Sequence, residues 1–89
     1  MKNKVTFYIT LSEPIDPKKL REAWEQHERL SPGQPRVAFT RIDAHGLEAE
    51  AYDISPDWIH EFRRTLGEVL LKLDEFCTIR EMLHVGEKL

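Results

Sequence analysis

Apolar and polar residues alternate in the first part of the chain, from Lys4 to Leu11. The apolar positions are Val5, Phe7, Ile9 and Leu11, and the polar positions between them are Thr6, Tyr8 and Thr10. A period of two residues, rich in β-branched and aromatic side chains, predicts a strand with one buried face.

A helical pattern follows this strand. Asp16 and Pro17 are residue types that favour the N-cap and the first position of a helix. Apolar and aromatic residues then recur at helical spacing: Leu20, Ala23, Trp24, His27 and Leu30. The other face is charged or amidic, so the pattern predicts a surface helix from Pro17 to about Leu30.

A second strand is predicted from Arg36 to Ile42, after a loop at 31–35 that contains two prolines and a glycine. Val37 and Phe39 are expected to face inward and Thr40 outward. Residues 43–46 are expected to form a turn in which glycine supplies a positive φ.

A third strand is predicted from Leu47 to Ile54. Its inward residues are expected to be Leu47, Ala49 and Ala51, and its outward residues Glu48, Glu50 and Tyr52. The small alanines leave room for a bulky helix side chain over this strand.

The longest helical pattern starts at Ser55 and Pro56, which form a cap followed by proline. Apolar residues then keep an i, i+3, i+4 spacing: Trp58, Ile59, Phe62, Leu66, Val69, Leu70, Leu73 and Phe76. The pattern predicts a helix from Pro56 to Phe76. Gly67 lies within it, which indicates a close packing contact at that point.

The tail at 77–85 has two interpretations. Ile79, Leu83 and Val85 fit the inward row of an edge strand, although Glu81 interrupts that row. The segment 78–81 also fits a capping box, which would start a short helix. We favour the strand, because the fold otherwise lacks its fourth strand.

This order of elements predicts an α+β fold for a single domain, residues 1–89. We expect a ferredoxin-like βαββαβ sandwich, in which two helices cover one face of an antiparallel sheet. A chain of this length can fold alone if it buries most of its large apolar side chains.

Charge and cysteine content limit the partners and the cellular location that we expect for this chain. Thirteen basic and sixteen acidic residues are interleaved, with a net charge of −3. Without a basic stripe, we expect no nucleic-acid partner. The single cysteine, Cys77, predicts a reducing, cytoplasmic location. No apolar run approaches the roughly 20 residues that span a bilayer, so we expect a soluble chain without membrane contact.

We predict no catalytic, cofactor-binding or metal-binding residues, and therefore a protein that is not an enzyme. Histidines that could bind a metal lie in different predicted segments: His27, His45, His60 and His84. None has the spacing of a metal motif. Cys77 fits a buried structural position. Glu48 and Glu50 fit a solvated strand face rather than an acid–base pair.

The predicted open face of the sheet carries mainly polar and tyrosine side chains: Thr6, Tyr8, Thr10, Thr40, Glu48, Glu50 and Tyr52. Tyr8 and Tyr52 have the chemistry of a base-stacking platform. The acidic surroundings favour instead a face that meets another protein or water.

Several segments resemble the cytoplasmic C-terminal α/β domain of the small-conductance mechanosensitive channel family. They are Pro35–Thr40, the turn at His45-Gly46, the strand end Ala51-Tyr52-Asp53, the helix start Pro56-Asp57-Trp58, and Asp16–Leu20 after the first strand. After the last helix, Phe76–Ile79 stands where that family has a glycine and a Phe-Pro run. The resemblance implies a non-enzymatic domain that takes part in subunit assembly.

We therefore expect a cytoplasmic assembly or interaction domain whose partner is protein. Self-association through a sheet face or edge is the first hypothesis. The alternative is a small stand-alone regulatory or phage-encoded factor that binds one protein partner. The sequence leaves open whether Met1 is a natural start or the boundary of an excised domain.

Overall fold

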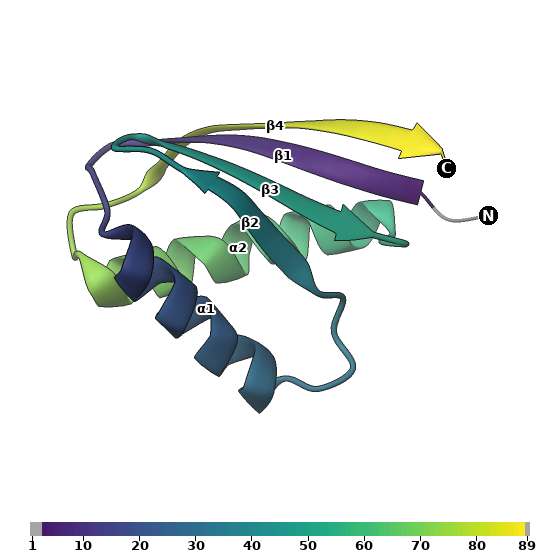
Figure 1. Ribbon diagram of the computed structural model, residues 1–89, viewed down its shortest axis with the longest axis horizontal. Helices are drawn as coiled ribbons and strands as arrows, with labels where there is room; N and C mark the ends of the chain where they lie inside the picture. Colours follow the sequence, from purple (N-terminus) through teal and green to yellow (C-terminus); the bar gives the residue numbers. More distant parts are fainter. Residues whose placement is uncertain (1–2, 89) are drawn as a thin grey trace.

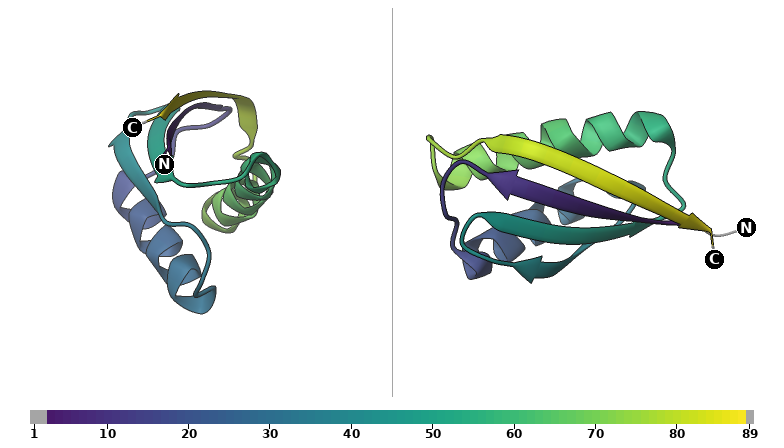
Figure 2. Two further views of the ribbon diagram at one scale, coloured as in Figure 1. Left: turned by 90° about the vertical axis from the view of Figure 1, so that its right-hand side faces the viewer. Right: turned by 90° about the horizontal axis from the view of Figure 1, so that it is seen from above.

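The chain forms an antiparallel sheet with the strand order β2-β3-β1-β4, covered on one face by two helices (Figure 1). The computed structural model describes residues 3–88. Its elements are β1 (Asn3–Leu11), α1 (Pro17–Leu30), β2 (Val37–Ile42), β3 (Gly46–Tyr52), α2 (Pro56–Leu73) and β4 (Ile79–Lys88). The two views of Figure 2 show both helices on the same side of the curved sheet. This confirms the ferredoxin-like α+β prediction.

Both helices begin where the sequence predicts. The Asp16 carboxylate accepts a hydrogen bond of 2.9 Å from the backbone N–H of Lys18, and the Ser55 hydroxyl accepts one of 3.3 Å from the N–H of Trp58. Proline follows each cap. Each cap therefore satisfies an N–H that would lack a partner in the first turn.

α1 ends at Leu30 as predicted, whereas α2 ends before the predicted Phe76. The N–H of Asp74 donates to the Leu70 carbonyl at 2.9 Å, and the Asp74 carboxylate accepts from the N–H of Phe76 at 2.9 Å. These bonds end α2 at Leu73, which leaves Phe76 72% exposed. Leu30, the last residue of α1, is 77% exposed, where α1 leads away from the sheet (Figure 1). Neither belongs to the core.

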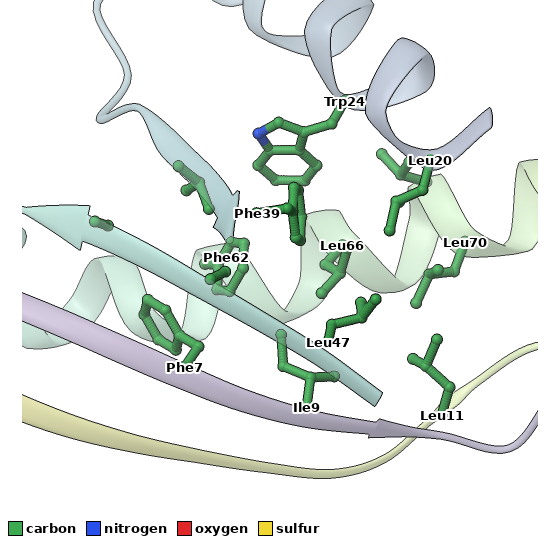
Figure 3. Packing of buried hydrophobic residues seen from close by; sticks show 14 of the residues in the cluster. Phe7, Ile9, Leu11, Leu20, Trp24, Phe39, Leu47, Phe62, Leu66 and Leu70 are labelled. Carbon is green, nitrogen blue, oxygen red and sulfur yellow. The ribbon is translucent and has the colours of Figure 1, made fainter. Parts of the chain in front are cut away.

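The centre of the core is built over Ala49. Phe7 and Phe39 flank this alanine on the neighbouring strands β1 and β2. Phe62 of α2 lies above, with its ring centroid 4.6 Å from that of Phe7, and Trp24 of α1 meets Phe62 edge-on at 5.6 Å (Figure 3). The small side chain of Ala49, fully buried, is consistent with the predicted room for a helix side chain. Burying each large side chain stabilises the fold by about 1.5–3 kcal/mol.

The tail forms a strand, β4, as favoured, but it contains a β-bulge near its start. Thr10 pairs with Glu81, whereas the next residue of β1, Leu11, pairs with Ile79. Arg80 is therefore an extra residue with no partner on β1. Such a bulge reverses which face each later side chain of the strand points to.

The bulge makes the predicted inward row of β4 wrong in part. Ile79 packs against the core as expected, but the core residue that follows the bulge is Met82. Leu83 and Val85, predicted to be inward, lie on the opposite face. The helices do not cover that face.

Two expectations for glycines are also wrong. Gly46 does not have a positive φ; among the glycines of residues 3–88, only Gly33 does, at 89°. The turn closes instead through a 2.8 Å bond from the N–H of Asp43 to the carbonyl of Gly46. At Gly67, a Cβ added to the backbone would meet no atom within 4 Å. The predicted close packing contact at this glycine is therefore absent.

Candidate functional site

The sheet face opposite the helices carries the largest group of exposed apolar and aromatic side chains on the strands. Its members are Tyr8 (44% exposed), Tyr52 (47%), Leu83 (57%) and Val85 (52%). In the ladder between β1 and β4, Tyr8 lies directly opposite Leu83 and Thr6 opposite Val85. No element within residues 3–88 covers these side chains, because both helices lie on the other face (Figure 2).

Lys4 and Glu50 form an ion pair on this open face. The Lys4 ammonium lies 3.3 Å from the Glu50 carboxylate, and its hydrogen bond to this carboxylate raises the pKa of Lys4. The Thr40 hydroxyl donates to the Glu48 carbonyl at 3.2 Å. Glu48 and Glu50 thus lie on the solvated face, as predicted, and contact other residues rather than forming a carboxylate pair.

Side chains of α1 bond two outward backbone groups at the outer edge of β2. The N–H of Val37 donates to the Glu28 carboxylate at 3.2 Å. The Arg21 guanidinium donates to the Phe39 carbonyl at 2.7 Å. Since alternate residues of an edge strand turn their backbone groups outward, these two bonds occupy groups that another strand would otherwise pair with.

The outer edge of β4 has no such cover. The N–H of Leu11 bonds the carbonyl of His45, which directly precedes β3. The odd-numbered residues of β1 therefore turn their backbone groups to β3, and the even-numbered residues turn theirs to β4. The β4 partners of those even-numbered residues are Glu81, Leu83, Val85 and Glu87.

The remaining residues of β4 between them therefore turn their backbone N–H and C=O groups outward. These residues are Met82, His84 and Gly86. Within residues 3–88, no side chain donates to or accepts from these outward groups. We call this row of groups the β4 edge.

The histidines are dispersed, as the sequence indicates. His27 lies against Trp24, with ring centroids 5.2 Å apart, and His84 lies 6.3 Å from Phe7. His45 is in the turn before β3 and His60 is on α2. Among residues 3–88, no three His, Cys, Asp or Glu side chains are grouped to hold a metal ion.

Cys77 is buried and its sulfur lies 3.7 Å from the Glu13 carbonyl. Burial raises the pKa of this thiol, which keeps it in the unreactive protonated form near neutral pH. The structure thus buries Cys77, as predicted.

The helices of residues 3–88 include none with the length and apolar character needed to cross a membrane.

No protein-family model matches the sequence, and no curated protein matches it either. Among solved structures, the chain is similar to one in the crystal structure of A. aeolicus tRNASec in complex with M. kandleri SerRS, with a TM-score of 0.63 and 18% identity. The match covers 91% of this chain and 18% of the other. The de novo designed protein Foldit4 aligns with a TM-score of 0.48 and 12% identity, over 100% of this chain and 99% of the design. At 18% identity the first of these likenesses concerns the fold alone.

Proposed function

We propose that this chain is a non-enzymatic, cytoplasmic assembly domain that pairs with a second copy of itself through the β4 edge. The observation that supports this most strongly is the difference between the two sheet edges. Side chains of α1 bond two backbone groups at the edge of β2, whereas the outward backbone groups of Met82, His84 and Gly86 have no side-chain partner within residues 3–88. Natural edge strands are protected against pairing by charged side chains or proline. From Met82 to Gly86 the strand has no Asp, Glu, Lys, Arg or Pro.

The side chains of β4 are suited to pairing with an identical strand. Only outward residues can bond across the new edge, so an antiparallel pair of β4 strands aligns even-numbered residues with each other. The register centred on His84 places Leu83 opposite Val85 of the second copy, and Val85 opposite its Leu83. Both exposed apolar side chains of each copy then share one face, beside Tyr8.

Two sources of support are independent of this register. The resemblance to the mechanosensitive-channel cytoplasmic domain implies a role in subunit assembly. Strand addition at a sheet edge is also a general mode of protein association, in which main-chain bonds supply affinity and alternate side chains supply specificity. A symmetric pair of copies satisfies both edges with the same residues.

Sedimentation over a range of protein concentrations tests the proposal. We expect the wild-type chain to sediment as a dimer at high concentration and the Leu83→Lys variant to remain monomeric, because lysine at the centre of an edge opposes pairing. Tyr52→Lys is the matched control, since Tyr52 is exposed on the same face but lies on β3.

Three results are distinguishable. A dimer lost in Leu83→Lys and kept in Tyr52→Lys supports the β4 edge. A dimer lost equally in both variants would place the contact on the sheet face and contradict edge pairing. A wild-type chain that is monomeric at every concentration would contradict self-association and leave the regulatory-factor alternative.

A further inference from the structure

A groove opens between the two helices, on the side of the molecule away from the open sheet face. It lies between the second half of α1, the segment 31–36, and the part of α2 from Trp58 to Glu68, and has a volume of about 930 Å³. Small-molecule sites are typically about 300–1,000 Å³. The groove is therefore large enough for a small ligand, and it does not involve the β4 edge.

Aromatic rings form the inner part of the groove. Trp58 stacks on Phe62 with ring centroids 5.5 Å apart and an interplanar angle of 11°. Trp24 meets Phe62 nearly perpendicularly, at 84° (Figure 3). The indole N–H of Trp58 donates to the side-chain oxygen of Gln34 at 3.3 Å. Flat aromatic surfaces of this kind favour a planar ligand.

The indole N–H of Trp24 is the unusual group in this groove. It is buried and has no hydrogen-bond partner, although buried tryptophan N–H groups usually have one. Figure 3 shows this nitrogen on the side of the ring that faces the start of β2. An unpaired buried donor costs free energy that an acceptor in the groove would recover.

Four glutamates and three arginines line the groove. Its glutamates all have partners: Glu25 with Arg29 (3.7 Å), Glu28 with the Val37 N–H (3.2 Å), Glu61 with Arg64 (2.6 Å) and Glu68 with Arg64 (3.9 Å). Arg36 also lines the groove, and within residues 3–88 no carboxylate pairs with it. Trp24 and Arg36 thus both offer N–H donors to an acceptor in the groove, and Arg36 also offers a positive charge.

We propose that this groove binds a small planar aromatic carboxylate. The carboxylate accepts a hydrogen bond from the Trp24 indole N–H and pairs with the Arg36 guanidinium, while the ring packs on the aromatic wall. Segment 31–36 is the wall of the groove that lies outside the helices and strands. A displacement of this segment gives the carboxylate access to the buried N–H.

The test uses naphthoate as the probe and naphthylmethylammonium, which has the same ring and the opposite charge, as its control. The indole N–H signals of Trp24 and Trp58 are followed by NMR during each titration, with assignments from single Trp→Phe variants. We expect naphthoate to shift the Trp24 signal in a saturable way and the ammonium compound to leave it in place. Trp24→Phe should weaken naphthoate binding at least about tenfold, because a bond from a donor to a charged group is lost.

Arg36→Gln gives a second measurement that does not depend on the core, because Arg36 is exposed and has no described contact to lose. It should also weaken naphthoate binding several-fold. The proposal is overturned if naphthoate causes no saturable shift at millimolar concentration, if both compounds bind equally well, or if neither variant changes the affinity.

Discussion

The guanidinium of Arg21 on α1 donates a 2.7 Å hydrogen bond to the carbonyl of Phe39 on β2. One helix side chain thus bonds an outward backbone group at one edge of the sheet, and this group belongs to Phe39, a core residue. The β4 edge has no counterpart among residues 3–88. This difference between the edges is the structural basis for the proposed assembly through β4 alone.

Arg21→Met tests the closure of β2. The variant keeps an apolar stem but loses the donor, and leaves the Phe39 carbonyl unpaired. We expect the free energy of unfolding, measured in urea, to fall by about 1–2 kcal/mol. Arg29→Met is the matched control in the same helix. Its pair with Glu25 is exposed and is worth less than about 0.5 kcal/mol. Equal losses in the two variants would show that the bond at the β2 edge has no special importance.

Glu81→Lys tests the register proposed for β4. In the register centred on His84, Glu81 faces Glu87 of the second copy at both ends of the paired strands. Lysine converts two repulsive pairs into attractive ones. The dissociation constant of the dimer should therefore fall several-fold. Glu22→Lys makes the same change in net charge on the exposed face of α1. If Glu22→Lys strengthens the dimer equally, net charge and not register explains the effect.

Gly67→Ala should stabilise the protein. The position is inside α2, its φ is not positive, and a Cβ there meets no atom within 4 Å. Alanine is therefore expected to raise the free energy of unfolding by about 0.5–1 kcal/mol through its higher helix propensity. Gly33→Ala is the contrasting variant, because Gly33 has a φ of 89° and alanine is strained there. A destabilised Gly67→Ala protein would indicate a packing contact that the structure lacks.

The buried thiol predicts a pH dependence. Burial raises the pKa of Cys77 above its ordinary value of 9.0, so the folded state holds this proton more tightly than the unfolded state. The stabilisation is fully present below pH 9.0 and is lost as the pH rises toward the folded pKa.

Cys77→Ala isolates this effect from other groups that titrate at high pH. The difference in the free energy of unfolding between wild type and variant should shrink as the pH rises above the ordinary thiol pKa. In the wild type, thiol-modifying reagents should react slowly at neutral pH and rapidly after unfolding. A difference that stays constant with pH, or rapid modification of the folded protein, would contradict burial of the thiol.

Local patterns predicted most of the fold. The alternation in Lys4–Leu11 and the caps at Asp16 and Ser55 involve only residues that are close together in the sequence. The structure confirms all three. The end of α2 was harder to predict, because the apolar spacing continues to Phe76. The helix ends earlier, where the Asp74 carboxylate accepts a hydrogen bond from the N–H of Phe76, and helical spacing alone gives no indication of this bond.

The candidate site depended on features that are not local. The alternation of Leu83 and Val85 was visible, but the bulge at Arg80 decides which face they occupy, and that bulge arises from pairing with β1. The closure of β2 likewise requires Arg21 and Glu28 to lie beside a strand that begins several residues later. The chemistry of these residues was readable from sequence, whereas their partners were set by tertiary structure.

Backbone hydrogen exchange at low and high protein concentration tests the central claim most directly, because it reports on single N–H groups of β4. The amides of Leu83 and Val85 bond to β1 and should exchange slowly at every concentration. The amides of Met82, His84 and Gly86 point outward and should exchange rapidly in dilute solution, then become protected as the concentration rises. If these three amides exchange at one rate across the whole concentration range, pairing through the β4 edge does not occur.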